Sequence, residues 1–149
     1  MIDKTQTEKW MFSALGEAKK AEKIDEVPIG AIIIKDNSII GRGFNQIESL
    51  KDSTAHAEII AITSASNTIG DWRLNKCSIY VTKEPCIMCI GAILNSRIES
   101  LYFGVSDKEN GYITTNKFIN NSVHLKSIEG NILEFDSKKI IQDFFLNKR

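Results

Sequence analysis

The chain contains little cysteine, no net charge and no long apolar run. Only three of its 149 residues are cysteines, which argues against a disulfide-rich secreted scaffold and favours the reducing cytoplasm. Lysine plus arginine number 19, and so do aspartate plus glutamate. Net charge therefore predicts no nucleic-acid binding, and an RNA partner would need locally clustered basic groups. We find no signal peptide and no apolar stretch long enough to span a membrane, and we expect no membrane association.

The composition is otherwise ordinary for a soluble globular protein, with 42% hydrophobic and 26% charged residues. A chain of this length can bury a substantial core. It contains no repeat, linker or low-complexity segment. The sequence therefore predicts a single domain over residues 1–149.

The strongest local signal is a pair of segments that carry metal ligands. A His-x-Glu segment holds His56 and Glu58, and a Pro-Cys-x-x-Cys segment holds Cys86 and Cys89. Catalytic zinc sites use three protein ligands and leave the fourth position for water. The ion lowers the pKa of that water from about 15.7 to about 7, and a neighbouring carboxylate can carry the proton. The order of these residues is the signature of the zinc base deaminases, and it predicts zinc on His56, Cys86 and Cys89 with Glu58 beside it.

The spacing of the four residues has a structural reason. Proline suits the start of a helix, so Pro85 predicts that Cys86 and Cys89 share the first turn of one. The positive end of the helix dipole favours their thiolate forms. His56 and Glu58 are too close in sequence to share a face in mid-helix, but both can lean toward one point where a helix begins. We therefore expect two helix N-termini aimed at a single ion.

Each part of this pattern also has a simpler interpretation. A lone histidine is usually a satisfied or solvated side chain, and a Cys-x-x-Cys pair can be redox-active in a thioredoxin-like context, which is not visible here. A closed structural zinc site would need a fourth ligand, for which Cys77 or His124 is available.

Hydrophobic periodicity predicts alternating strands and helices after an initial hairpin. Both metal-ligand segments follow strands, so the site should lie at the carboxyl edge of the sheet. This pattern indicates a three-layer α/β/α domain with a mixed sheet. We expect helices over about 7–23, 55–69 and 86–95 and near the C-terminus, and strands at 29–34, 38–44, 77–82, 98–104 and 123–128.

On these motifs the chain resembles the cytidine-deaminase-like superfamily and, within it, the bacterial tRNA adenosine deaminases. The resemblance covers nearly the whole chain. It is carried by Glu26-Val27-Pro28-Ile29-Gly30-Ala31, Asn45, the two metal-ligand segments, Trp72-Arg73-Leu74, Ser96-Arg97-Ile98, Phe103-Gly104 with Asp107, and Asp143-Phe144-Phe145. It implies a five-stranded mixed sheet, one zinc ion per subunit, a homodimer, and hydrolytic deamination of adenosine to inosine at wobble position 34 of a tRNA anticodon.

The resemblance also implies roles for individual residues. Glu58 would take a proton from the attacking water, protonate the ring nitrogen and later help ammonia to leave. Asn45 would hydrogen-bond the flipped base, the Ala57 backbone would help to seat it, and Val27 and Ile29 would wall its pocket. The residues expected to touch the tRNA anticodon stem-loop are Asp107, Lys108, Phe144, Lys148 and Arg149.

The chain departs from the family pattern at several positions. Ser53 stands where many relatives have proline, and Lys83 where they usually have leucine. The segments 111–115 and 120–123 lack the small-residue and basic character common there. The altered 106–122 segment and the zero net charge motivate an alternative, a deaminase of free nucleobases or nucleosides such as guanine or cytosine. A non-catalytic zinc-stabilised binding module is a third possibility, against which Glu58 argues.

Overall fold

The computed structural model describes residues 4–115 and 122–148. Its elements are α1 (Lys4–Lys23), β1 (Gly30–Lys35), β2 (Ser38–Phe44), α2 (Ile47–Leu50), α3 (Ala57–Ile69), β3 (Ser78–Lys83), α4 (Ile87–Asn95), β4 (Ser100–Val105), β5 (Ser127–Glu129) and α5 (Glu134–Leu146).

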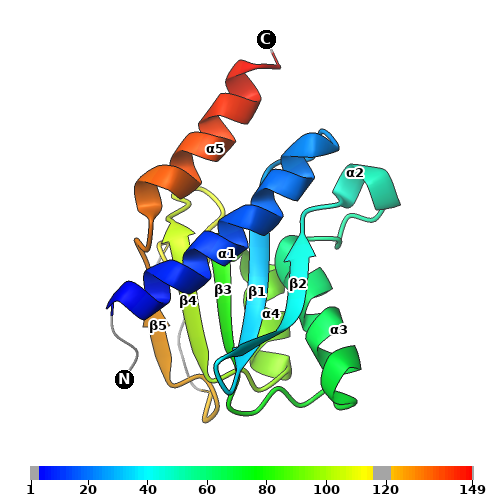
Figure 1. Ribbon diagram of the computed structural model, residues 1–149, viewed down its shortest axis with the longest axis vertical. Coiled ribbons are helices and arrows are strands. Elements are labelled where there is room, and N and C mark those ends of the chain that lie inside the picture. The colour runs from blue at the N-terminus through cyan, green and yellow to red at the C-terminus, as the bar shows by residue number, and fades with distance from the viewer. Residues whose placement is uncertain (1–3, 116–121, 149) are drawn as a thin grey trace.

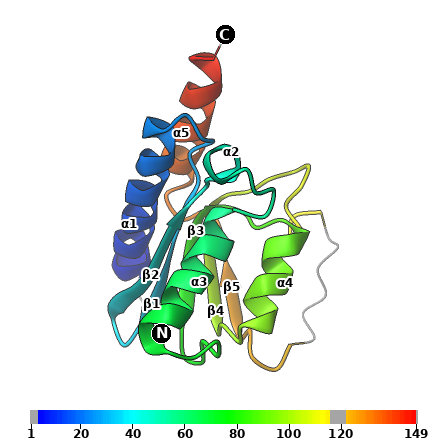
Figure 2. The ribbon, with the colours of Figure 1, turned by 90° about the vertical axis from the view of Figure 1, so that its right-hand side faces the viewer.

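Five strands form one mixed sheet in the order β2-β1-β3-β4-β5 (Figure 1). The pairs β2–β1 and β1–β3 are antiparallel, and the pairs β3–β4 and β4–β5 are parallel. Figure 2 shows α1 and α5 on one face of the sheet and α3 and α4 on the other. The predicted three-layer α/β/α fold with a five-stranded mixed sheet is therefore confirmed.

The core lies on both faces of the sheet, because the central strands bury side chains in both directions. Ile32 and Ile34 of β1 pack against the apolar stripe of α1, while Ala31 and Ile33 face α3 and α4. The continuous apolar run in the sequence predicted this two-sided burial. The α1 stripe consists of Trp10, Met11, Ala14, Leu15, Ala18 and Ala21.

Glycines in β2 allow α3 to lie directly on the sheet. A Cβ atom on Gly43 would stand 2.3 Å from the carbonyl oxygen of Ala57 and 2.6 Å from the amide nitrogen of Ala61. The two backbones therefore approach closely here, and the β1–β2 pairing shifts register between Ile33 and Ile34, which marks a bulge. The contact at Ala57 fixes where α3 begins relative to the sheet.

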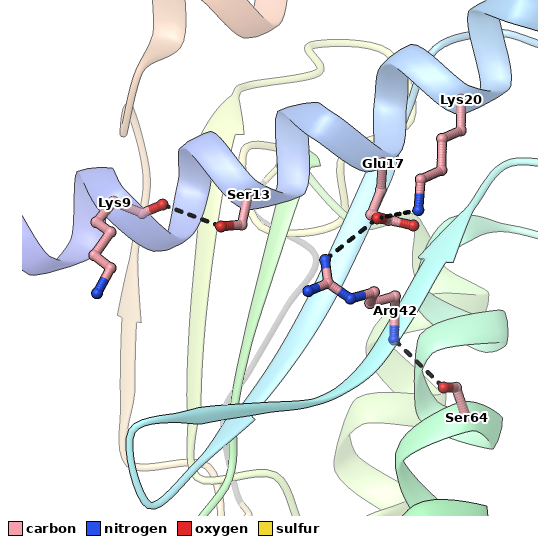
Figure 3. Close-up of polar contacts among 6 residues, drawn as sticks. All are labelled: Lys9, Ser13, Glu17, Lys20, Arg42 and Ser64. Carbon is pink, nitrogen blue, oxygen red and sulfur yellow. Dashed lines mark hydrogen bonds and ion pairs between the residues drawn. The ribbon is translucent and has the colours of Figure 1, made fainter.

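A buried carboxylate links the outer layers through β2. Glu17 of α1 is 3% exposed, and its Oε2 accepts hydrogen bonds from Lys20 Nζ at 2.8 Å and Arg42 Nη1 at 3.4 Å (Figure 3). The backbone N–H of Arg42 donates to Ser64 Oγ in α3 at 3.4 Å. One residue of β2 therefore contacts a helix on each face of the sheet.

The structure differs from the sequence-based expectations at two points. The fifth strand, predicted over 123–128, begins only at Ser127, because its pairing with β4 starts there, and Val123 is 82% exposed. The single turn α2 was missed, because four residues are too few for a hydrophobic period to be detected.

In the part of the chain that the structure describes, no helix combines the length and hydropathy needed to cross a bilayer.

Candidate active site

The three predicted metal ligands meet where two helices begin. His56 is the N-cap residue of α3, and Cys86 is the N-cap residue of α4, with Cys89 in the first turn that follows. His56 Nδ1 lies 3.7 Å from Cys86 Sγ and 3.5 Å from Cys89 Sγ. All three ligand atoms lie within 4.8 Å of one another. The arrangement of two helix N-termini around one point is the one that the spacing predicted.

These separations fit a zinc ion. Zinc binds sulfur at about 2.3 Å and imidazole nitrogen at about 2.0–2.1 Å in tetrahedral geometry, which places N and S ligands about 3.6 Å apart. The observed separations of 3.5 and 3.7 Å bracket that value. The group formed by His56, Cys86 and Cys89 includes neither Cys77 nor His124 in the described part of the chain. The structure therefore gives no support to a closed site with four protein ligands.

The local environment also favours metal binding by Cys86. A hydrogen bond with the Cys89 thiol, and then one with His56, lower the pKa of Cys86 to about 3. The same contact with Cys86, together with burial, raises the pKa of Cys89. The lowered pKa favours the thiolate form of Cys86, which is the form that binds metal ions.

Glu58 lies beside this group without belonging to it. It is the second residue of α3 and is 4% exposed. Burial raises the pKa of Glu58, and a backbone hydrogen bond and the nearby His56 oppose this shift only in part. A buried carboxyl group beside residues that can hold a metal ion is suited to accept a proton and return it.

A cavity of about 420 Å³ opens onto the group, within the range of roughly 300–1,000 Å³ that small-molecule sites occupy. Five of the predicted substrate-binding residues line it, namely Val27, Ile29, Asn45, Ala57 and Asp107. The other lining residues are Ile47, His56, Glu58, Lys83, Glu84, Cys86, Ile87, Asn110 and Phe145. The cavity can hold a nucleoside but not a folded RNA.

Asn45 is fixed in the cavity wall by its own contacts. It is 5% exposed, and its Nδ2 donates to the carbonyl oxygen of Val27 at 3.3 Å. The backbone N–H of Ile47 donates to its Oδ1 at 3.4 Å. Both bonds are long, so the amide is held in place while it can still offer hydrogen bonds to a ligand.

The remaining predicted contacts lie outside the cavity lining. Lys108 is exposed, and Phe144 is buried at 8% exposure. Lys148 forms an ion pair with Asp25, and its Nζ lies over the Phe144 ring. Arg149 lies outside the described residues. The aromatic ring that lines the cavity is that of Phe145, which is 50% exposed. Of these two adjacent rings, Phe145 therefore lies at the cavity and Phe144 is buried beside it.

Lys83 and Asp107 form an ion pair at the cavity that sequence reasoning missed. Their Nζ and Oδ2 atoms are 3.1 Å apart. Burial alone would raise the pKa of Asp107, but hydrogen bonds from the backbone N–H groups of Asn110 and Glu109, together with Lys83, hold it below its ordinary value. The only available signal was the lysine at position 83, where relatives usually have leucine.

Comparisons with known proteins agree with this geometry. The family model of the MafB19-like deaminases matches residues 5–149. The tRNA-specific adenosine deaminase of Buchnera aphidicola subsp. Schizaphis graminum is 46% identical over 142 residues, which cover 94% of each chain. A solved structure from a study of A-to-I editing by tRNA:A34 deaminases has a TM-score of 0.83 and 38% identity, and covers 89% of this chain and 98% of the other.

The guanine deaminase of Bacillus subtilis is a more distant neighbour, with a TM-score of 0.64 and 31% identity over 74% of this chain and 68% of its own. The fold and the His/Cys/Cys group, taken with these matches, define a deaminase, a hydrolase that acts on a carbon–nitrogen bond. More narrowly, the chain belongs to the family of tRNA-specific adenosine deaminases.

Proposed function

We propose that this chain converts adenosine to inosine at wobble position 34 of tRNA anticodons by hydrolytic deamination. The observation that carries the proposal is the group of His56, Cys86 and Cys89 beside the buried Glu58, at a cavity sized for one nucleoside. The names of its relatives supply the substrate. We propose one catalytic domain, supported by the family match to residues 5–149, located in the cytoplasm.

The metal proposed for this group is zinc, one ion per subunit, held by His56 Nδ1 and the two thiolates. When bound, zinc supplies an acidified water, with a pKa of about 7. Glu58 takes a proton from the attacking water and delivers it to the adenine ring nitrogen. As the carbon–nitrogen bond breaks, Glu58 takes a second proton from the hydroxyl now on the ring carbon and passes it to the departing ammonia, so the ring carbon keeps the oxygen as a carbonyl.

The other cavity residues hold the base for this step. Val27 and Ile29 supply apolar walls, and Asn45 and the Ala57 backbone supply hydrogen bonds. A base in a single-stranded loop can be splayed into such a pocket at lower cost than one in a duplex. Beyond the pocket, we propose that Lys108, Phe144, Lys148 and Arg149 contact the anticodon loop, together with Asp107 and Phe145 of the cavity lining.

We also propose that the chain works as a homodimer, in which a second copy covers α4. Apart from Cys89, this helix is apolar up to Asn95, yet Ile87 at its start is 65% exposed. Gly91 lies one turn further along the same face, with open space around it. Gly91→Arg should therefore leave the monomer folded but convert the dimer to monomer, measured by light scattering with size exclusion. A monomeric wild type contradicts the proposal.

The test of function compares substrates directly. Wild-type protein is incubated with an anticodon stem-loop that carries adenosine at position 34, with the same loop carrying adenosine at a neighbouring position, and with free guanine, cytosine and adenosine. We expect inosine only at position 34. Turnover of a free base without editing of the RNA favours the free-base deaminase, and activity on none of them favours the non-catalytic zinc module.

A further inference from the structure

The buried carboxylate of Glu84 is bound by one loop. Glu84 follows β3 directly and is 4% exposed. Its Oε1 accepts a hydrogen bond from the backbone N–H of Asp107 at 3.0 Å, and its Oε2 accepts from the N–H groups of Ile113 at 2.9 Å and Thr114 at 2.6 Å. The hydroxyl of Thr114 also donates to Oε1. All four donors belong to residues 107–114.

The hydrogen bonds between Glu84 and the loop satisfy polar groups on both sides. A buried carboxylate is costly unless hydrogen bonds compensate for the lost water. Residues 107–114 form turns and no helix or strand, so the loop in turn depends on Glu84 for part of its backbone hydrogen bonding. The carboxylate and the loop therefore stabilise each other.

The loop fits closely around the carboxylate. A Cβ atom on Gly111 would stand 2.4 Å from Glu84 Cδ and 2.4 Å from the carbonyl oxygen of Asp107. The N–H of Gly111 donates to that same carbonyl at 2.9 Å. Glycine at this position lets the loop close over Glu84, and a larger residue would force the two apart.

The same loop forms one wall of the cavity. Asp107 and Asn110 line it, and the Asp107 carboxylate accepts hydrogen bonds from the N–H groups of Glu109 and Asn110 at 3.0 and 3.1 Å. Lys83, the neighbour of Glu84, pairs with the Asp107 side chain. The end of β3 therefore fixes Asp107 both by its backbone and by its carboxylate.

We propose that Glu84 is a positioning residue for substrate recognition, which holds the 107–114 loop so that Asp107 and Asn110 face the substrate. Both of its oxygens are engaged by the loop, so it acts through the loop and not on the reacting atoms. The inference rests on the proposed function, because it concerns the same cavity.

The test uses Glu84→Gln, which keeps the size of the side chain but places an NH₂ donor against backbone N–H donors. We expect KM for the anticodon stem-loop to rise on the order of tenfold, with kcat reduced less than about threefold and zinc content unchanged. Amide hydrogen exchange of residues 107–114 should accelerate. The hydrogen-exchange measurement needs no substrate, so it tests the positioning role even if the wild-type protein does not edit RNA. Failure of the wild type to edit RNA would contradict the proposed function but not the positioning role.

A matched control separates positioning from general destabilisation. Glu17→Gln removes a carboxylate that is buried to a similar extent, 3% against 4%, but its partners lie in α1 and β2. It should lower the melting temperature and leave KM and loop exchange unchanged. Thr114→Val removes the hydroxyl donor that the loop offers to Glu84. It should raise KM by less than Glu84→Gln does. Combined with Glu84→Gln, it should add less than its separate effect, because both act on one contact.

Several results would overturn the proposal. Loss of zinc or a fall in kcat at unchanged KM in Glu84→Gln would mean that the residue acts on the metal group. An equal KM rise in Glu17→Gln would mean that any loss of stability suffices. If Glu84→Gln does not fold, Thr114→Val decides, and unchanged KM and loop exchange in that variant refute the positioning role.

Discussion

Replacing Glu58 with glutamine isolates the proton-transfer step, because the amide keeps the shape of the side chain but cannot carry a proton. General acid–base catalysis by one positioned group contributes about 10² to 10⁴ in rate, or roughly 3 to 5.5 kcal/mol of barrier. Glu58 is 4% exposed, so bulk water has little access to replace it. The loss should therefore lie near the upper end of this range.

The same variant should not destabilise the metal-free protein. Burial raises the pKa of Glu58 above its ordinary value. A carboxyl group whose folded-state pKa is raised costs stability once the pH exceeds its ordinary pKa, so a neutral amide removes that cost at pH 7. We therefore expect Glu58→Gln to keep one zinc per chain, to keep or raise the melting temperature after chelation, and to lose nearly all turnover.

The assay follows inosine formation in single-turnover conditions, with melting curves and metal content measured on the same samples. The control is Glu17→Gln, which replaces a carboxylate buried on the other face of the sheet. This variant should keep its kcat. A kcat for Glu58→Gln within about threefold of wild type would refute its assignment as the proton carrier.

Three further perturbations probe the surroundings of the site. Gly43→Ala forces a methyl group to within 2.3 Å of the Ala57 backbone. The free energy of unfolding, measured by urea denaturation, should therefore fall by about 1–3 kcal/mol or more, and zinc binding by His56 should weaken. An unaltered denaturation midpoint contradicts the close packing. Asp107 has a lowered pKa, so its charge stabilises the fold above about pH 4, and this contribution disappears as the pH falls through the lower folded-state value. Asp107→Asn should thus cost about 1–2 kcal/mol at neutral pH and less in acid, whereas a pH-independent cost contradicts the assignment. Removing the metal with a chelator should abolish activity and lower the melting temperature, and zinc should restore both; full activity after complete removal excludes a metal-dependent reaction.

The metal group was predictable from sequence because its geometry is local. Cys86 and Cys89 belong to one helical turn, and His56 stands at the start of another helix. Strand alternation then brings both helix starts to the same edge of the sheet, so short-range patterns suffice to place the ligands.

The cavity walls were less predictable because they depend on contacts between distant residues. Glu84 binds backbone groups 23 to 30 residues away, and such contacts leave no periodic pattern. In α5, adjacent phenylalanines are equivalent in sequence, and only packing decides that Phe144 is buried and Phe145 lines the cavity. That packing includes Ser137 against Gly104, where a Cβ atom has no room.

The most direct test of the account is to follow the oxygen. An anticodon stem-loop with adenosine at position 34 is incubated with the zinc-loaded protein in ¹⁸O-labelled water, and the product RNA is digested and analysed by mass spectrometry. The account predicts one inosine, at position 34, carrying one ¹⁸O atom from water, with one ammonia released for each. Unmodified RNA, modification at another position, or inosine without the label contradicts it.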